Sequence, residues 1–367
     1  MTLAGAVAVA MFVGVIAYAL FAGADFGSGF YDLTAGGGVR GAEMRTLVDH
    51  SIGPVWEANH VWLIYVLVIW WTGFPAAFAA AMTTLFIPLM LALAGIVLRG
   101  ANFAFRKHAE IFGQARFFGV IFAASSVITP FFLGTVAGAI ASGRIPAGGY
   151  GDMIGSWFNP TSLVGGCLAV TTCIFLAGVF LTADAARTGH PELAQRLRQR
   201  TLVIGVAAGV IVFAGLYPIL HDAPTLSSGL LGAGLPLLVL AAAAGTITLA
   251  LLYRRMYSIA RAFAVTAVGA VVAAWGVGQY PWILVDQLTI TQAAGADATL
   301  AGLLVVVALA VVIVLPAFGY LLLLTQTQKR SRTQGRWFDP IPGGTRMTRP
   351  RSTLTMDGGN PAAGAVR

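Results

Sequence analysis

Long apolar runs, rather than alternating apolar and polar residues, dominate residues 1–325 of the chain. A helix needs about 20 consecutive apolar residues to cross the hydrocarbon core of a bilayer. Strands of a membrane barrel would alternate with a period of two, and the sequence lacks this alternation. The pattern therefore predicts an all-α fold, a polytopic transmembrane helical bundle.

Nine apolar segments are long enough to be membrane spans. They lie near residues 3–24, 55–73, 76–98, 117–141, 161–183, 201–220, 231–252, 262–284 and 299–325. Only Gly73, Phe74 and Pro75 separate the second segment from the third, which predicts a tight turn with Pro75 opening the next helix. No Lys or Arg precedes the first segment, so we expect a retained helix rather than a secretory signal.

Composition supports a lipid environment, because 58% of the residues are hydrophobic and only 10% are charged. Soluble domains carry about 25% charged residues. The net charge of +8 comes from loops and the C-terminal segment, so we expect membrane lipids and no nucleic acid as partners. Cys167 and Cys173 are six residues apart on one expected span and point in different directions, which predicts no disulfide and no metal site.

The basic residues also predict an orientation. Every Lys and Arg except Arg144 falls either in loops on one side of the nine-span arrangement or in the C-terminal segment. Cytoplasmic loops carry the excess of basic residues, so we expect the cytoplasmic (inner) membrane, with the N-terminus outside and the C-terminus in the cytoplasm. Residues 326–367 are expected to form a basic, disordered cytoplasmic tail after the membrane domain, residues 1–325. The tail is either simply solvated or in contact with anionic lipid headgroups.

A weak internal similarity links residues 87–107 with residues 235–255, since both begin with a Leu- and Pro-containing apolar run and end in a basic loop. It fits two four-helix units plus one additional helix. Chance similarity between apolar helices explains it equally well.

Charged residues near the spans are the first candidates for function, because a charge at the bilayer centre costs about 2.5–3.5 kcal/mol. Asp25 lies at the expected cytoplasmic end of the first span, between Gly23 and Gly27, which permit close helix approach. Asp32 lies seven residues later on roughly the same face. Asp25 is either an interfacial carboxylate in a helix-packing patch or a functional group.

Glu57 lies close to the start of the second span, shortly after Pro54. A carboxylate in the first turn is favoured by the helix dipole alone; the alternative is a proton acceptor at the cytoplasmic mouth of a buried path. His60, one turn later, is placed to share a proton with Glu57, although a lone histidine there is more often structural than a haem ligand. Trp56 and Trp62 also fit a membrane-interface belt.

Arg99 closes the third span, where the helix dipole and the loop-charge rule both favour a basic residue. It also lies on the side expected for Asp25 and Glu57, and an ion pair with either of them is possible. Gln279, which ends the eighth span, can form hydrogen bonds between helices. The sequence contains no phosphate-binding loop, nucleophile elbow or zinc spacing, so hydrolysis and nucleotide binding are not indicated.

Four stretches carry a family resemblance: Gly23–Gly29, Ile52–Leu63, Phe74-Pro75 with the helix that ends at Arg99, and Trp275–Leu300. In their order and spacing, the chain resembles subunit II of cytochrome bd-type quinol oxidases over roughly residues 5–325. There are two departures. Ala22 occupies a place where family members usually carry an acidic residue, which puts a relay through it in doubt, and Glu57 replaces the usual aspartate.

The resemblance implies a two-subunit quinol:oxygen oxidoreductase in which subunit I holds haem b and haem d. Subunit II is then expected to have two four-helix bundles plus a ninth, peripheral helix, and no haem ligands. It would pack against subunit I, support haem assembly and contribute to proton uptake. A structural quinone in this chain and a small accessory subunit are further expectations.

The resemblance also assigns roles to residues, none of which is expected to be directly catalytic or to bind a metal. Glu57 is expected to carry protons, Asp25 to be a second relay or an assembly carboxylate, and Arg99 to be their electrostatic partner. His60 belongs to the same expected path. Trp56, Asn59 and Gln279 support the motifs in which they lie.

Two other classes of protein compete with the oxidase interpretation. A secondary transporter would carry inverted repeats and broken helices that meet near the midplane of the membrane, whereas the polar residues here gather near one end of the spans. A membrane scaffold subunit of some other complex is the second alternative.

Overall fold

The computed structural model describes residues 2–36, 38–106, 112–314, 316–317 and 319–320, apart from the side chains of residues 38–40, 52–58, 103–106 and 112–118. Helices account for most of these residues, as the apolar pattern predicts. The elements are α1 (Leu3–Leu33), α2 (Gly38–Gly73), α3 (Pro75–Thr84), α4 (Phe86–Arg106), α5 (Phe112–Ala141), α6 (Pro160–Arg187), α7 (Pro191–Asp222), α8 (Pro224–Leu231), α9 (Leu235–Tyr253), α10 (Tyr257–Gly278), β1 (Trp282–Leu284), β2 (Leu288–Thr289), α11 (Asp297–Leu309) and the π-helical turn η1 (Ala310–Val314).

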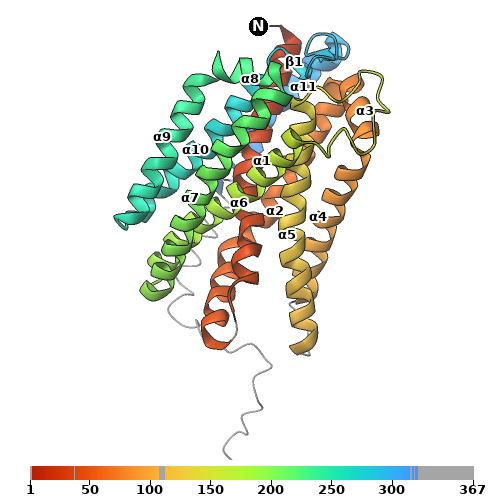
Figure 1. The fold of residues 1–367 in the computed structure, drawn as a ribbon. Helices are drawn as coiled ribbons and strands as arrows, with labels where there is room; N and C mark the ends of the chain where they lie inside the picture. Colours follow the sequence, from red (N-terminus) through yellow and green to blue (C-terminus); the bar gives the residue numbers. More distant parts are fainter. Residues whose placement is uncertain (1, 37, 107–111, 315, 318, 321–367) are drawn as a thin grey trace, which may run out of the picture.

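Helix α1 is the central element of the bundle. It packs against α2, α5, α6, α10 and α11, with α4 and α5 on one side of the molecule and α9 and α10 on the other (Figure 1). Large apolar side chains are exposed on the outer helices, among them Val203 and Phe213 on α7 and Val239 on α9. An exposed apolar surface of this kind is expected of helices whose solvent is lipid.

Seven helices of the described residues are long and apolar enough to cross a membrane, and an eighth span results if the bent pair of α2 and α3 is counted as one. The protein is therefore an all-helical membrane protein. The predicted turn at residues 73–75 is confirmed: the Asn59–Gly73 part of α2 and α3 meet at 116°, with Phe74 between them and Pro75 at the start of α3. The count of nine spans and the grouping into two four-helix bundles plus one helix stay predictions.

The expected third span, residues 76–98, is not continuous, because the helix breaks at Leu85 between α3 and α4. The cause lies in Pro88, which has no N–H to donate to the carbonyl of Thr84 and whose ring would clash with it. The loop after α5 holds the freed end of α3, because Gly151 N donates to Thr84 Oγ1 at 3.2 Å. The proline was visible in the sequence, but its effect at this position was not predicted.

The expected eighth span, residues 262–284, also ends early, at Gly278. Pro281 cannot continue a helix and disfavours helical backbone at the residue before it. The chain instead forms the antiparallel hairpin β1–β2. The hydroxyl of Thr225 at the start of α8 donates to Asp286 Oδ1 in the hairpin turn at 2.9 Å, so two segments expected to be plain loops are tied together.

The two ends of the bundle differ in charge. The end of α1, the start of α2 and the α6–α7 connection lie at the lower end in Figure 1, and α3, α8, β1 and the start of α11 lie at the upper end. Two of the predicted loops rich in Lys and Arg, the α1–α2 and α6–α7 connections, belong to the lower end, here called the basic end. Arg144 lies in the connection between α5 and α6, at the upper end.

Candidate functional site

A buried ion pair joins α1 to α4. Arg99 Nη2 lies 2.5 Å from Asp25 Oδ1, and only 2% of each side chain is exposed. Helix α1 continues to Leu33, nine residues beyond the expected end of the first span at residue 24. The Asp25 side chain is enclosed within the bundle. The sequence offered Asp25 and Glu57 as partners for Arg99; the structure shows the pair with Asp25, and the side chain of Glu57 lies outside the described residues.

Arg99 is held on several sides. Its Nη2 also donates to the main-chain oxygen of Asp25 at 2.8 Å, and its Nη1 donates to the hydroxyl of Ser126 on α5. The guanidinium carbon lies 4.3 Å from the ring centre of Phe122 and 5.2 Å from that of Phe26. Removing one partner of a buried ion pair costs about 3–5 kcal/mol, because the other charge is left unpaired. The pair therefore connects three helices and tolerates change poorly.

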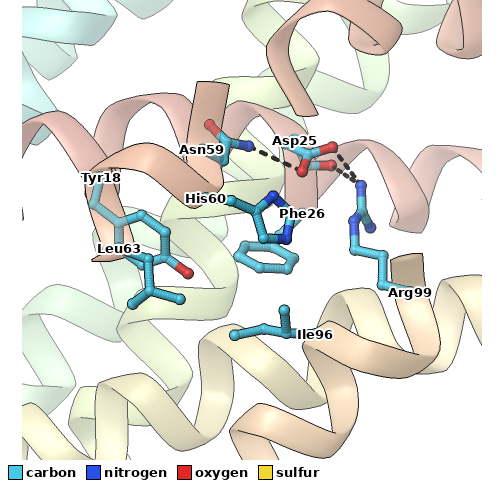
Figure 2. A pocket seen from close by; sticks show the side chains of 8 residues that line it. All are labelled: Tyr18, Asp25, Phe26, Asn59, His60, Leu63, Ile96 and Arg99. Carbon is cyan, nitrogen blue, oxygen red and sulfur yellow. Dashed lines mark hydrogen bonds and ion pairs between the residues drawn. The ribbon is translucent and has the colours of Figure 1, made fainter. Parts of the chain in front are cut away.

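Asn59 on α2 completes the surroundings of the Asp25 carboxylate. Its Nδ2 donates to Asp25 Oδ2 at 2.9 Å, and its side chain is 4% exposed. Both carboxylate oxygens thus accept a hydrogen bond, one from Arg99 and one from Asn59 (Figure 2). Asn59 Oδ1 is buried and accepts no hydrogen bond from the described residues. An unmet buried acceptor costs about 1–3 kcal/mol, so this atom calls for an explanation.

Glycines allow α1 to lie so close to its neighbours. A Cβ atom at Gly27 would overlap the carbonyl oxygen of Cys173 on α6, and one at Gly29 would overlap the hydroxyl of Ser126. The close approach predicted for Gly27 is thus present. It brings the α1 turn that carries Asp25 between α5 and α6, and this position explains why Asp25 is buried.

A small pocket adjoins the ion pair and has room for about one water molecule. Its lining comes from α1, α2 and α4: Tyr18, Asp25, Phe26, Asn59, His60, Leu63, Ile96 and Arg99. Figure 2 shows the His60 ring and the Tyr18 hydroxyl on the same side of the Asp25 carboxylate. The pocket therefore gathers four of the residues singled out from the sequence: Asp25, Asn59, His60 and Arg99.

Of the other predicted residues, Gln279 does not line this pocket, and two have side chains for which the structure gives no position. The side chains of Trp56 and Glu57 lie outside the described residues, although their backbone belongs to α2. Gln279 follows the last residue of α10, at the opposite end of the bundle from the basic end (Figure 1). Its Oε1 is buried and without a hydrogen bond from any described residue. Gln279 is therefore separate from the Asp25 pocket.

Two residues of the site were missed from the sequence, although each left a signal. Ser126 belongs to a Ser-Ser pair inside an otherwise apolar run, and both of these serines are buried. Tyr18 precedes Asp25 by seven residues, a spacing that places both on one helix face. Buried hydroxyl groups in a membrane helix and a two-turn spacing from a carboxylate are useful criteria for such a site.

A second charged cluster lies at the upper end of the bundle. Arg144 Nη1 donates to Asp222 Oδ2 at 2.9 Å, and the hydroxyl of Thr161 donates to the same oxygen at 2.7 Å. The hydrogen bond from Arg144 to Asp222 raises the pKa of the arginine. The one basic residue that departed from the predicted charge asymmetry is thus neutralised by a partner and fixes the α5–α6 connection to the end of α7.

The pocket beside His60 does not fit a haem. The described residues also form no group of three or more His, Cys, Asp and Glu able to hold a metal ion. The His60 pocket holds about one water molecule, far less than a porphyrin needs. Ring nitrogens of His50 and His221 contact the main-chain oxygens of Thr46 and Tyr217, each at 2.8 Å.

A bundle of long apolar helices around a buried ion pair defines an integral membrane protein with a polar site in its interior. Which membrane protein it is follows from comparison with known families. The family model of cytochrome bd terminal oxidase subunit II matches residues 3–325. The chain belongs to this family.

Two relatives of known family match about half of the chain. The chain is 29% identical over 206 residues to cytochrome bd ubiquinol oxidase subunit 2 of Bacillus subtilis (strain 168), covering 53% of this chain and 56% of the relative. It is 27% identical over 222 residues to cytochrome bd-I ubiquinol oxidase subunit 2 of Escherichia coli (strain K12), covering 56% of each. These matches span little more than half the length of the relatives.

The fold is similar to a chain in the structure of bd oxidase from Geobacillus thermodenitrificans, with a TM-score of 0.72 and 23% identity. The similarity covers 88% of this chain and 98% of that chain. At this identity the match shows the fold.

Proposed function

We propose that the chain acts as subunit II of a cytochrome bd-type quinol oxidase, beside a haem-bearing subunit I. The complex would oxidise quinol and reduce oxygen to water. The observation that carries the proposal is the match of the family model across residues 3–325, nearly the whole apolar part of the chain. On this proposal, haem b and haem d belong to subunit I.

The arrangement in the membrane is part of the proposal. The loops rich in Lys and Arg gather at the basic end, and this end would face the cytoplasm under the rule that basic loops stay inside. The N-terminus would then lie outside and the C-terminus in the cytoplasm. Nine spans, with residues 1–325 as the membrane domain and residues 326–367 as a cytoplasmic tail, complete the proposed topology of a protein in the cytoplasmic membrane.

The buried site would serve proton uptake and assembly of the complex. Oxygen reduction consumes protons, and a path through lipid needs groups that hold charge away from water. Asp25 and Arg99 provide such groups on α1 and α4, and His60 lines the adjoining pocket. Glu57, two residues before Asn59 in α2, would pass protons to this pocket. Because Arg99 and Asn59 hold both oxygens of Asp25, we assign Asp25 to organising the site at least as much as to relaying protons.

Other proposed partners follow from the membrane setting and from the family. Quinol would be the substrate of the complex, and lipids would cover the exposed apolar faces of α7 and α9. Trp56 and Gln279 would support the local structure of their motifs. A structural quinone in this chain and a small accessory subunit remain parts of the proposal that biochemical composition would test.

The experiment is a gentle purification of the tagged chain from its native membrane, followed by gel analysis and a reduced-minus-oxidised visible spectrum. A second large subunit, bands of haem b and haem d, and quinol-dependent oxygen consumption are expected. A single colourless chain from both well-aerated and oxygen-limited cells would contradict the proposal. Solute uptake in vesicles would then test transport, and a co-purifying partner without haem would indicate a scaffold.

A further inference from the structure

The nitrogen and the oxygen of the Asn59 amide differ in their hydrogen bonding, and the ion pair alone does not explain this difference. Its amide nitrogen donates to Asp25 Oδ2 at 2.9 Å, while its amide oxygen is buried without a hydrogen bond from the described residues. Buried polar groups nearly always have a partner, and an exception inside a site calls for a functional reason. Asn59 also lines the pocket beside Asp25, where a proton would have to arrive.

An asparagine amide carries a donor and an acceptor on one planar group. A half-turn about its last side-chain bond would exchange the two, so that Oδ1 rather than Nδ2 faced Asp25. The nitrogen orientation suits an ionised carboxylate, which only accepts hydrogen bonds. The oxygen orientation suits a protonated carboxyl, which has an O–H to donate. Arg99 cannot make this exchange, because a guanidinium has donors only.

We propose that Asn59 is a positioning residue that controls whether Asp25 binds a proton, donating to the carboxylate and, after a half-turn of its amide, accepting from the carboxyl. The proposal rests on the proposed function, since it concerns proton uptake by the oxidase. In the step itself, one proton from the pocket binds to Asp25 Oδ2, and the new O–H donates to Asn59 Oδ1. Deprotonation reverses both changes, and Arg99 keeps its contact with Oδ1 of Asp25 throughout.

Other groups around Asp25 also influence its charge. Tyr18 on α1, His60 on α2 and Arg99 on α4 share the pocket, and Cys173 on α6 is close enough to interact with Asp25 electrostatically. On α5, Ser126 contributes a hydroxyl group that does not titrate in the accessible range. All of these are unchanged when only Asn59 is substituted, so a comparison of variants isolates the amide.

The chain offers a matched control for Asn59. Asn102 on α4 is also 4% exposed, but its Nδ2 donates to the main-chain oxygen of Leu98 in its own helix at 2.6 Å. Replacing either residue by leucine removes the same buried group, a side-chain amide. Only the change at Asn59 removes a group that contacts Asp25.

The test measures quinol-dependent oxygen consumption against pH in purified complexes of the wild type, Asn59→Leu, Asn59→Asp and Asn102→Leu, with haem content recorded for each. Asn59→Leu removes a hydrogen bond that favours the anion. It should lower the rate by about tenfold or more and move the pH profile toward higher pH. Asn59→Asp keeps nearly the same side-chain shape but adds a negative charge beside Asp25, so it should move the pH profile further in the same direction. Asn102→Leu should leave the profile in place.

A uniform loss of rate in both Asn59 variants without a move of the profile would overturn the proposal, and so would wild-type behaviour of either one. Loss of haem from both Asn59 variants, but not from Asn102→Leu, would assign Asn59 to assembly and equally overturn it. A wild-type complex without oxidase activity would instead refute the proposed function, so the two failures are distinguishable.

Discussion

Arg99 contacts Asp25 twice through one nitrogen: its Nη2 lies 2.5 Å from the side-chain Oδ1 and 2.8 Å from the main-chain oxygen of the same residue. The second contact fixes Arg99 to the backbone of α1 as well as to a movable carboxylate. The pair therefore sets the separation of α1 and α4 at the depth of the pocket.

Removing the guanidinium should destabilise the protein strongly. Arg99→Met leaves Asp25 buried without its cation, at a cost of about 3–5 kcal/mol, and thermal unfolding of the purified complex should show a lower midpoint. Arg187→Met is the control: its side chain is 63% exposed and pairs with Asp184 at 2.9 Å, and such surface pairs contribute at most about 1 kcal/mol. Equal effects of the two substitutions would show that burial of the Arg99 pair has no energetic consequence.

Proton delivery by Glu57 is a prediction from the sequence. Glu57→Gln keeps the shape of the side chain but cannot ionise, so oxygen reduction should slow by about tenfold or more while the haem spectrum stays unchanged. Glu192→Gln is the control, because the Glu192 side chain is 90% exposed at the start of α7. A wild-type rate in Glu57→Gln would remove the proton role, and a loss of haem would move Glu57 to assembly.

The contact between α1 and α6 should not tolerate a methyl group. Gly27→Ala places a Cβ atom on the carbonyl oxygen of Cys173. Because this oxygen belongs to the backbone of α6, the helices must separate, at a cost of about 1–3 kcal/mol. Gly245→Ala in α9 meets no atom within 4 Å and should be neutral or stabilising by about 0.5–1 kcal/mol, because alanine is the better helix former. Thermal unfolding of both variants tests the difference, and an unaffected Gly27→Ala would refute the close contact.

The upper cluster should hold the α5–α6 connection in place. Asp222→Asn removes the charge that Arg144 and Thr161 contact, and the partly exposed pair should contribute about 1 kcal/mol or less. Limited proteolysis should then cut residues 142–159 faster than in the wild type. Raising the salt concentration should shrink the difference, because salt screens the wild-type pair. A difference that is independent of salt would contradict an electrostatic cause.

The length and composition of the apolar runs determined that the chain is a helical membrane protein. In lipid, only helices and closed barrels satisfy the hydrogen bonds of the backbone, and the sequence lacks the alternation of side chains that barrel strands would show. The turn at Gly73–Pro75 was also legible in the sequence, since proline and glycine act locally. The break at Leu85 was not predicted, although its cause, Pro88, is local too. Proline alone does not decide such a break, because Pro130 and Pro218 lie inside the continuous helices α5 and α7.

For the candidate site too, the sequence predicted one part and tertiary packing decided the rest. Asp25, His60 and Arg99 stood out in the sequence because charged and titratable groups are rare in apolar segments. Which of them meet was decided by tertiary packing, since Gly27 and Gly29 let α1 approach α5 and α6 closely enough to enclose Asp25 and bring it to Arg99. The roles of Ser126 and of the Asn59 amide appeared only there, because a hydrogen bond between helices depends on distances that no spacing along one chain specifies.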